Sequence, residues 1–522
     1  MSAQTLRGDQ SADSRRWWAL AVIAVAQLMI VLDITIVNIA LPSAQKDLGI
    51  SDADRQWVIT AYTLAFGGLL LLGGRLGDLF GRKRVFVIGL LGFAAASALG
   101  GGATGPTMLF AARALQGAFG ALLAPSALGL LSTTFSDPRE RSTAFGIFGA
   151  IAGGGAAIGL ISGGLLTEYL NWRWCLFVNT PIAIVTAVAA FYLLTPDHIA
   201  KGRRVKLDLP GAFLGCGGLL AIVYGTSEAV NRGWGDWLVL GSLILGVLLL
   251  LLFVLVEKRT PHALLPLHIV AERNRGGGAL SVGLAMIGMF GVFLFLTYYL
   301  QVIKGYSPVM TGVAFLPMTG AIVLSSTTIA ARLMTRVPSR NLIATGLALA
   351  AGGLAVLTQL TVASSFATTV LPGELLLGFG MGMVFMPSMS LATLNVAPHE
   401  TGAAAATINS AQQVGGSFGT ALLNTIAASV TATYLASRVA SDPLVQANGA
   451  VHGYAVATTV AMVILVLAAV IAFLMINHRP APGEAEGHPA AAETTAPAAT
   501  EGADADADVL AAQRQNSLRS ES

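Results

Sequence analysis

Three ionisable residues, Asp33, Arg113 and Glu374, lie inside long runs of apolar sequence. Asp33 lies about two-thirds of the way along its run (17–41), roughly 24 Å from the start at about 1.5 Å per residue of helix. A carboxylate is costly to charge in hydrocarbon unless a partner compensates it, so such a group suits a proton carrier. We interpret Asp33 as that carrier. The alternative is a buried carboxyl that only hydrogen-bonds to helix backbone.

Arg113 and Glu374 extend this interpretation. Arg113 enters its run (107–134) from the other end, at a depth comparable to that of Asp33. Its charge can adjust the proton affinity of Asp33 or Glu374, unless the side chain snorkels to the surface. Opposite charges that face one low-dielectric cavity attract each other. We therefore expect Arg113 and Glu374 to contribute to an outer gate.

Four further residues are candidates for lining a substrate cavity. Asn38 and Gln116 are polar side chains inside apolar runs, and such side chains usually face the protein interior. Tyr298 and Tyr299 belong to an aromatic stripe that fits a lipophilic pocket, although such a stripe more often packs against helices or lipid.

The sequence offers little for catalysis. The seven histidines form no HExxH or Cys/His cluster, so no metal site is expected. No GxxxxGK[ST] motif is present, which excludes a P-loop ATPase, and no nucleophile–base pair is visible. Cys175 and Cys216 fall near opposite ends of successive apolar runs, so a disulfide is not expected. We predict no enzymatic activity and no cofactor, with a proton gradient as the energy source.

The positions of these residues depend on a membrane architecture. Charged residues make up 11% of the 522, against roughly 25% in soluble domains, and the mean hydropathy is +0.72. Apolar segments of about 20 residues recur, each long enough to cross roughly 30 Å of hydrocarbon as a helix. The first is too long for a signal-peptide core. The sequence predicts an all-α polytopic membrane protein with fourteen transmembrane helices. They are expected at 17–41, 56–76, 85–103, 107–134, 142–166, 174–195, 209–229, 236–256, 277–301, 310–331, 341–361, 367–394, 402–430 and 454–476.

Basic residues predict the orientation. With the N-terminus inside, the inner segments hold 22 Lys and Arg and the outer loops hold 6. Since Lys and Arg accumulate on the cytoplasmic side, both termini are expected to be cytoplasmic, in a cytoplasmic (inner or plasma) membrane. The tail is rich in Ala, Pro and acidic residues and is expected to be a disordered cytoplasmic extension.

An internal repeat appears at an offset near 260 residues. Gly155-x-x-x-Gly159 matches Gly415-x-x-x-Gly419, and Arg113-x-x-x-Gly117 corresponds to Glu374-x-x-x-Gly378. The equivalent helices run in the same direction, which predicts two parallel six-helix bundles with two helices inserted between them. The expected organisation is a cytoplasmic N-terminus (1–16), an N-terminal bundle (17–195), a cytoplasmic loop (196–208), the inserted helices (209–256), a cytoplasmic loop (257–276), a C-terminal bundle (277–476) and the tail (477–522).

The stretch Leu72–Arg84 concentrates polarity between two apolar runs. Its glycines permit a sharp turn, its basic residues hold the turn in the cytoplasm, and Asp78 is able to accept hydrogen bonds from a helix N-terminus across the interface between the halves. We interpret the stretch as a conformational latch; the alternative is that it only orients the helices. The expected members of the latch are Gly74, Gly77, Asp78, Gly81, Arg82, Lys83 and Arg84.

These motifs resemble those of the major facilitator superfamily, specifically its fourteen-helix drug–proton antiporter branch. Gly74–Arg84 resembles the signature between spans two and three, and Leu32–Pro42 the first-span motif. Arg113–Gly117 is similar to the fourth-span arginine motif, and Gly155–Gly164 to the antiporter motif of span five. The resemblance implies two six-helix bundles, alternating access and proton-coupled efflux.

The span-five motif departs from the family pattern, because Leu160 stands where the family has proline. Proline would kink the helix, so this helix is expected to be straighter. Its glycines still allow close packing of neighbouring helices. The residues concerned are Gly155, Gly159, Gly163 and Gly164.

The expected function is proton-driven export of lipophilic drugs or antibiotics, cationic or neutral, by a protein that acts as a monomer in the lipid bilayer and binds no nucleic acid. Export of one endogenous metabolite or lipid by the same mechanism remains an alternative. A membrane enzyme or a receptor-like sensor is disfavoured, because neither catalytic groups nor a folded soluble domain are evident.

Overall fold

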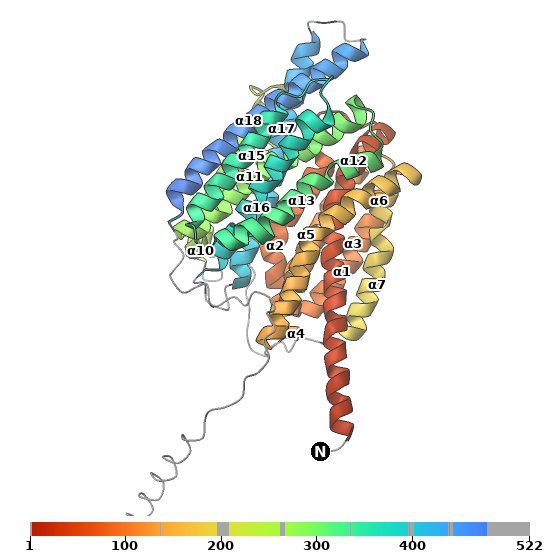
Figure 1. Cartoon of the computed structure of the whole chain (residues 1–522), viewed down its shortest axis with the longest axis vertical. Coiled ribbons are helices and arrows are strands. Elements are labelled where there is room, and N and C mark those ends of the chain that lie inside the picture. Colours follow the sequence, from red (N-terminus) through yellow and green to blue (C-terminus); the bar gives the residue numbers. More distant parts are fainter. Residues whose placement is uncertain are drawn as a thin grey trace, which may run out of the picture. The chain divides into compact units, whose positions relative to one another are not determined.

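The computed structural model describes residues 3–477, apart from 136, 196–207, 261–266, 335, 395, 397–400, 437 and 439–441. Every regular element in the described ranges is a helix (Figure 1), which confirms the all-α prediction. Most of the predicted loop 196–208, and the predicted tail beyond Asn477, lie outside the described residues.

The first set of helices contains Asp33 and Arg113. Asp33 lies within α1, which continues to Leu48, beyond the expected end at Leu41. Proline at the first turn begins α4, as is common for helices. The elements of this set are α1 (Ala3–Leu48), α2 (Trp57–Phe80), α3 (Arg82–Gly101), α4 (Pro106–Thr134), α5 (Pro138–Tyr169), α6 (Trp174–Phe177) and α7 (Asn179–Leu193).

The last set contains Glu374 and includes three π-helical turns, written η. Side chains cap several of these helices; for example, Ser307 accepts a hydrogen bond from the backbone N–H of Met310 at the start of α12. The elements are α10 (Leu267–Ala271), α11 (Arg273–Tyr298), η1 (Tyr299–Ile303), α12 (Pro308–Ala314), α13 (Leu316–Leu324), η2 (Ser325–Ala330), α14 (Ala331–Leu333), α15 (Ser339–Leu357), η3 (Phe366–Val370), α16 (Leu371–Thr393), α17 (Thr401–Ala436) and α18 (Pro443–Met475).

The two sets pack their helices in the same pairs. In the first set α1 packs against α5, α4 and α7, and α3 packs against α4 and α7. In the last set α11 packs against α17, α16 and α18, and α15 packs against α16 and α18. We refer to these sets as the N-half and the C-half. This correspondence is what a parallel repeat requires, whereas the exact domain boundaries stay a prediction.

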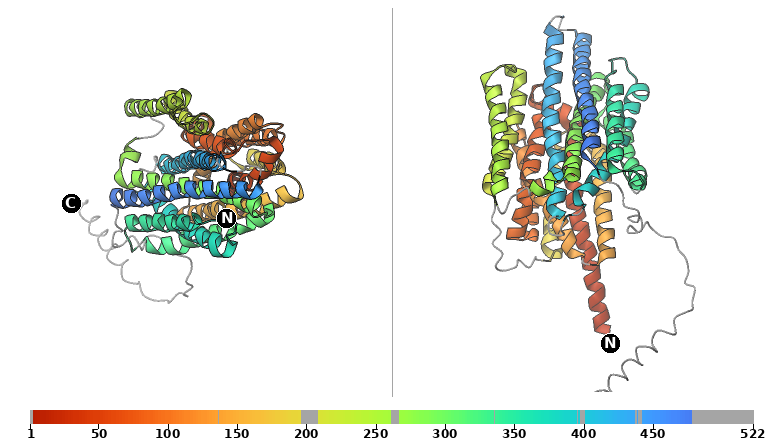
Figure 2. Two further views of the ribbon diagram at one scale, coloured as in Figure 1. Left: turned by 90° about the horizontal axis from the view of Figure 1, so that it is seen from above. Right: turned by 90° about the vertical axis from the view of Figure 1, so that its left-hand side faces the viewer.

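A separate pair, α8 (Leu209–Arg232) and α9 (Trp237–Arg259), lies between the halves in sequence. The two helices pack against each other, and α8 also contacts α2 and α17. Most of α9 is apolar and exposed, which suits contact with lipid. Figure 2 shows the pair at the side of the bundle, in yellow-green.

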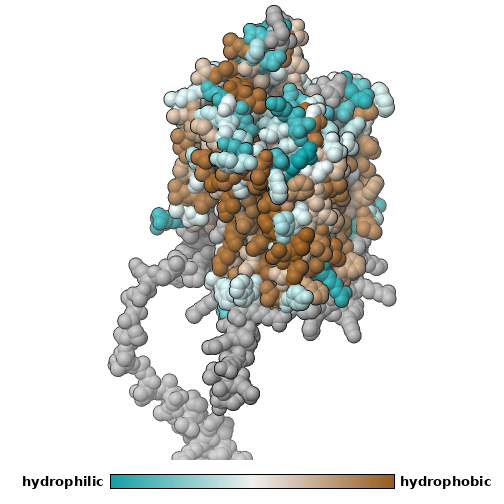
Figure 3. Space-filling view, turned by 90° about the vertical axis from the view of Figure 1, so that its right-hand side faces the viewer, coloured by the Kyte–Doolittle hydropathy of each residue, from teal (hydrophilic) through white to brown (hydrophobic). Residues whose placement is uncertain are grey.

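Twelve helical segments among the described residues are long and apolar enough to span a membrane. The α5 and α17 helices, of 32 and 36 residues, are the two predicted spans outside that set. The count of fourteen spans therefore stays a prediction. Figure 3 shows a broad hydrophobic belt on one face of the bundle, with hydrophilic side chains gathered toward one end.

The two most extensive helix contacts between the halves involve α2 and α5 of the N-half. The α2 helix packs against α17, where the hydroxyls of Thr63 and Ser417 lie 2.6 Å apart. The α5 helix packs against α12, and a side chain at Gly312 would collide with the carbonyl oxygen of Leu160. Small and hydroxyl-bearing residues thus allow the halves to approach closely.

Candidate functional site

The side chain of Asp33 lies at the centre of a polar cluster inside the N-half. Its Oδ2 is 2.6 Å from Nη1 of Arg113, and its Oδ1 accepts hydrogen bonds from Gln116 at 3.0 Å and Asn179 at 2.8 Å. All four side chains are almost completely buried. The alternative in which Asp33 bonds only to helix backbone is therefore wrong.

The guanidinium of Arg113 is held on several sides. Its Nε donates to the carbonyl oxygen of Val58, its Nη1 also donates to Oε1 of Gln116, and the group lies over the ring of Tyr62, 4.5 Å from the centroid. Arg113 is 1% exposed, so it does not snorkel to the surface. These contacts fix its orientation toward Asp33.

Helices distant in sequence build the cluster. α1 supplies Asp33, α4 supplies Arg113 and Gln116, and α7 supplies Asn179 at its first residue. Gln116 also donates to the hydroxyl of Ser97 on α3. Because the ions are paired and hydrogen-bonded, their burial is tolerated; removing one partner would leave a buried charge, at a cost of about 3–5 kcal/mol.

Sequence reasoning missed Asn179 and Ser97. Asn179 is a polar residue within an apolar run, the same signal that singled out Asn38 and Gln116. Ser97 gave no such signal, because a single serine is easily accommodated in a membrane helix.

The expected pairing of Arg113 with Glu374 is not formed in this structure. Arg113 binds Asp33 of its own half, which supplies the nearest carboxylate. Glu374 lies near the start of α16, fully buried, and neither of its carboxyl oxygens has a hydrogen-bond partner among the described residues.

The other cavity candidates have defined contacts here. The amide of Asn38 donates to the carbonyl oxygen of Ile34, whereas its own Oδ1 is buried without a partner in the described part of the chain. The hydroxyl of Tyr298 donates to Oε1 of Gln45, and that of Tyr299 donates to the carbonyl oxygen of Thr361 at 2.8 Å. Their role in lining a cavity stays a prediction.

The predicted latch stretch forms the junction of α2 and α3. Gly81 alone separates the helices and adopts φ +91°, a conformation that favours glycine. Arg82 donates to the carbonyl oxygen of Gly129 on α4, and Lys83 donates to those of Phe191 and Leu194 at the end of α7. These bonds tie the basic residues to the N-half.

The remaining latch residues are also placed. Gly77 lies against Ser126 and Gly74 against Pro125, both on α4, and Arg84 is exposed. Asp78 belongs to the last turn of α2, but its side chain lies outside the described residues. The latch across the halves therefore stays a prediction.

The glycines of the span-five motif lie at close helix contacts. A side chain at Gly159 or Gly163 would collide with α1, at Thr35 and Ile36 respectively, and Gly155 faces Leu28 and Val31 of α1. Gly164 instead faces α12 of the C-half, near Val309. The backbone of α5 is helical throughout Pro138–Tyr169, including Leu160, as expected in the absence of proline.

A second cluster, which the sequence did not reveal, lies around the loop between α1 and α2. Arg55 in this loop is 4% exposed; it donates to Oδ1 of Asn424 on α17 at 3.0 Å and lies 4.0 Å from the ring centroid of Tyr298. Asn424 in turn donates to the carbonyl oxygen of Asp52. We call this group of contacts the Arg55 clamp.

Two more hydrogen bonds join the halves at the end of the bundle that contains the Arg55 clamp. Oε2 of Glu168, at the end of α5, accepts from the backbone N–H of Val309 in the first turn of α12. Nε2 of Gln301 donates to the carbonyl oxygen of Ile39 on α1. The carboxylate of Glu168 thus caps a helix of the opposite half. The sequence analysis predicts this kind of interaction for Asp78. The halves are closed together at this end.

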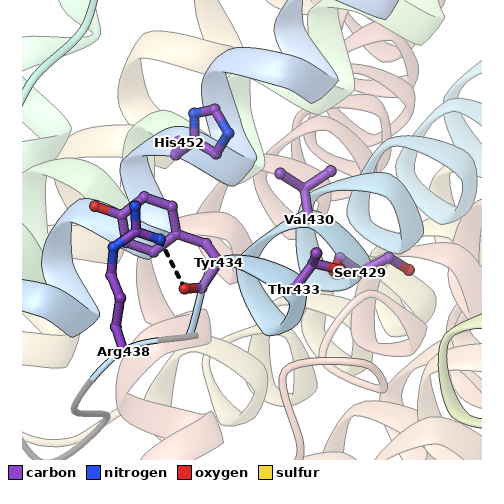
Figure 4. A pocket seen from close by; sticks show the side chains of 6 residues that line it. All are labelled: Ser429, Val430, Thr433, Tyr434, Arg438 and His452. Atoms are coloured by element: carbon purple, nitrogen blue, oxygen red, sulfur yellow. Dashed lines mark hydrogen bonds between the residues drawn. The ribbon is translucent and has the colours of Figure 1, made fainter. Parts of the chain in front are cut away.

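A separate groove of about 410 Å³ lies between α17 and α18, where they extend past the other helices (Figures 2 and 4). Arg438 lies 3.6 Å over the ring of Tyr434 and donates to its carbonyl oxygen, and His452 lies beside that ring. The groove shares no residue with the Asp33 cluster. No group of three or more metal-ligating side chains occurs among the residues described.

Residues 23–420 match the model of the Major Facilitator Superfamily. The chain belongs to the major facilitator superfamily. It is therefore a multi-pass membrane transporter and not an enzyme, as the sequence predicted.

Several relatives within the superfamily share most of their length with this chain. The puromycin resistance protein pur8 of Streptomyces alboniger is 57% identical over 472 residues, covering 90% of this chain and 93% of that protein. The cephamycin export protein CmcT of Amycolatopsis lactamdurans is 39% identical, covering 81% and 87%. The tetracenomycin C resistance and export protein of Streptomyces glaucescens is 36% identical, covering 80% and 76%.

Solved structures of this superfamily fold are similar at low identity. A bacterial homologue of the human lysosomal transporter Spinster, inward-facing and unoccupied, has a TM-score of 0.62 at 14% identity and covers 88% of this chain and 97% of its own. The POT family transporter PepTSo has a TM-score of 0.62 at 15% identity, covering 89% and 99%. These similarities establish the fold.

Proposed function

We propose that this chain exports lipophilic antibiotics in exchange for protons, and that Asp33 carries the proton. The observation that supports this most directly is the buried cluster of Asp33, Arg113, Gln116 and Asn179. A carboxylate that is fully buried yet balanced by one arginine has two accessible states, charged and paired or neutral and protonated.

Protonation of Asp33 changes the energy of the whole cluster. The neutral acid no longer compensates the positive charge of Arg113, and Gln116 and Asn179 lose a strong acceptor. The bonds that join α1, α4 and α7 weaken, so proton binding favours a different packing of these helices.

The α1 helix connects this cluster to the closed end of the bundle. Ile39 and Gln45, about 1.7 and 3.3 turns beyond Asp33 along α1, accept hydrogen bonds from the C-half residues Gln301 and Tyr298 respectively. If protonation of Asp33 moves α1, the movement also changes the contacts of Ile39 and Gln45. These contacts must break for this end of the bundle to open. The Arg55 clamp must open at the same time, because it lies at the same end.

The substrate class follows from the relatives. Puromycin, an amphipathic nucleoside antibiotic with an amino group, is the first candidate, because the puromycin resistance protein matches over nearly the whole chain. Lipophilic cationic or neutral compounds are expected in general. The bilayer and protons are the other partners, and the protein acts as a monomer.

The orientation is proposed from basic residues, 22 on one side and 6 on the other. Both termini then face the cytoplasm, and the Arg55 clamp closes the outer end. Reporter fusions after Arg204 and after Arg232 should report opposite sides of the membrane. The same side for both would contradict the fourteen-span arrangement.

Transport is tested with inverted membrane vesicles that contain the protein. A proton gradient with an acidic lumen should drive puromycin uptake as protons leave the vesicle, and collapse of the gradient should abolish accumulation. Uptake that needs no gradient, or that a gradient does not change, would contradict proton exchange. A panel that adds neutral and anionic compounds defines the breadth of substrates.

A further inference from the structure

Glu374 is the one acidic residue in the sequence of helices α11–α17. It lies in the first turn of α16, at the position that corresponds to Arg113 of α4, and it is completely buried. The proton-exchange mechanism proposed above for Asp33 makes no use of it.

The environments of the two buried acids differ. Asp33 has an ion pair and two further hydrogen bonds, whereas neither Oε1 nor Oε2 of Glu374 has a partner among the described residues. An unpaired carboxylate in an apolar interior loses its hydration without compensation, which costs several kcal/mol or more. A protonated carboxyl avoids most of that cost.

No ion pair to Glu374 is formed by the described residues of the helices around it. One turn along α16, Leu377 and Gly378 pack against Gly353 of α15 and Met318 of α13. α13, η2 and η3 contain no titratable side chain. The remaining titratable groups of the packed elements α11, α15 and α17, and of η1 and α14, which continue α11 and η2, are Arg273, Arg275, Tyr298, Tyr299, Arg332, Arg340 and Tyr434, the last of which stacks with Arg438.

None of those groups is positioned to balance Glu374. The four arginines lie at the ends of their spans that are opposite to the end of the bundle holding Glu374; they are Arg273, Arg275, Arg332 and Arg340. Tyr298 bonds to Gln45, and Tyr299 bonds to the carbonyl oxygen of Thr361. The carboxyl of Glu374 is therefore buried with neither an ion-pair partner nor a hydrogen-bond partner among the described residues.

The backbone beside Glu374 is irregular. The π-helical turn η3 directly precedes α16, and Pro372 in the first turn of α16 has no N–H to donate. Such turns repack more easily than a continuous α-helix, so a change of conformation is able to bring water to the carboxyl.

We propose that Glu374 is a second proton-binding site, located in the C-half and independent of the Asp33 cluster. In the closed state described here it holds its proton as a neutral carboxyl. When the start of α16 opens to water, the O–H bond breaks, the proton passes to water and the carboxylate becomes hydrated. One transport cycle then exchanges two protons for one substrate molecule.

This inference rests on the proposed proton exchange, but its first test does not require transport. In infrared difference spectra of the purified protein, we expect the C=O stretch of a protonated carboxyl without strong hydrogen bonds at neutral pH. Glu374→Gln should remove this band, and Glu374→Asp should shift it. Glu228→Gln, which removes an acid paired with Arg232 on α8, serves as the control and should leave it unchanged.

The second test measures stoichiometry in proteoliposomes at zero membrane potential. Each coupled proton multiplies the equilibrium gradient of a cationic substrate by about tenfold per pH unit. The gradient of the puromycin cation should thus rise about 100-fold per pH unit in the unmodified protein and about tenfold in Glu374→Gln.

The outcomes separate the two proposals. A tenfold slope in both proteins, or a carboxyl band that survives Glu374→Gln, would overturn the second proton site. Absence of any gradient-driven transport by the unmodified protein would contradict the proposed function instead, and the infrared band would still decide the state of Glu374.

Discussion

Among single residues, Asp33 shows how a costly buried charge is made tolerable. One arginine compensates its charge, and two side-chain amides, from Gln116 and Asn179, bind its other oxygen. These amides stabilise the charged form more than the neutral form, because hydrogen bonds to an ion are stronger. They therefore influence the pH at which the proton binds.

The first prediction concerns Gln116 as a positioning residue. Gln116→Ala removes a donor to Asp33 and an acceptor for Arg113, at a cost of about 1.5–3 kcal/mol. We expect the turnover of proton-driven export to fall roughly tenfold and its pH profile to shift, with little change in puromycin binding. Gln116→Asn should restore part of the rate.

The matched control is Gln446→Ala, which changes a glutamine of α18 outside the Asp33 cluster. Loss of puromycin affinity in Gln116→Ala, with an unchanged pH profile of transport, would assign Gln116 to the substrate cavity instead.

Asp33 and Arg113 could be identified from sequence because charged residues are rare in apolar runs. Their pairing could not be predicted, since depth along a helix does not specify rotation about its axis. For the same reason Arg113 was paired with Glu374 across the halves. Arg55 gave no signal either, because a basic residue in a loop is ordinary; only the fold buries it.

At the scale of helices, Glu272 defines the start of α11. Its carboxylate accepts hydrogen bonds from the backbone N–H groups of Asn274 and Arg275, and it lies 3.3 Å from Nε of Arg275. Partial burial works against the charged form, but these bonds and the guanidinium prevail and hold the pKa of Glu272 below its usual value.

The second prediction follows from the sign of this shift. A lowered pKa adds stability above the unfolded value of about 4.3, and this contribution is lost as the pH falls through the folded value. Glu272→Gln should destabilise the protein by about 1 kcal/mol at pH 7. The difference in Tm from the unmodified protein should shrink toward zero as the pH falls below 4. A difference that stays constant with pH would show that the charge of Glu272 does not matter.

The third prediction concerns the Arg55 clamp. Arg55→Ala removes a buried hydrogen bond from a charged group and a stacking contact across the halves, together worth roughly 2 kcal/mol. The population open at this end should rise by roughly 30-fold, since 1.4 kcal/mol corresponds to about a factor of ten. Distance measurements between spin labels on the α1–α2 loop and the start of α18 report this opening.

Arg232→Ala serves as the control, because Arg232 pairs with Glu228 on its own helix and makes no bond to another element within the described part of the chain. Equal label distances in Arg55→Ala and in the unmodified protein would show that the clamp does not hold this end closed.

The helices themselves were predictable because apolar runs between polar residues mark membrane spans. Where a helix extends beyond the hydrocarbon, its sequence is no longer uniformly apolar, so its end cannot be predicted from the apolar run. α1 runs on to Leu48 and α18 begins at Pro443, both beyond the predicted bounds. The π-helical turns of the C-half were also unpredicted, because they depend on how the packed helices fit together.

At the scale of the molecule, the same helix pairs pack in both halves, and α2–α17 and α5–α12 join them. The repeated glycine pairs anticipated this arrangement, because equivalent small residues allow equivalent close contacts. The halves differ in their buried charges. Among the described residues, the N-half holds a buried ion pair of Asp33 and Arg113, whereas the C-half holds one fully buried acid, Glu374. Protonation of Asp33 is thus expected to change the packing of the N-half first and to affect the C-half through the contacts of α1.

Proton-driven accumulation by Asp33→Asn tests the central claim most directly. The variant is assayed in proteoliposomes beside Asp47→Asn, which removes a half-exposed acid of the same helix. Because Asp33→Asn leaves Arg113 uncompensated, Asp33→Asn combined with Arg113→Gln is measured as well. We predict that both Asp33 variants accumulate labelled puromycin about tenfold less per pH unit than the unmodified protein, because only the proposed proton site at Glu374 remains coupled, whereas Asp47→Asn accumulates it normally. Accumulation by folded Asp33→Asn equal to that of the unmodified protein would contradict the account.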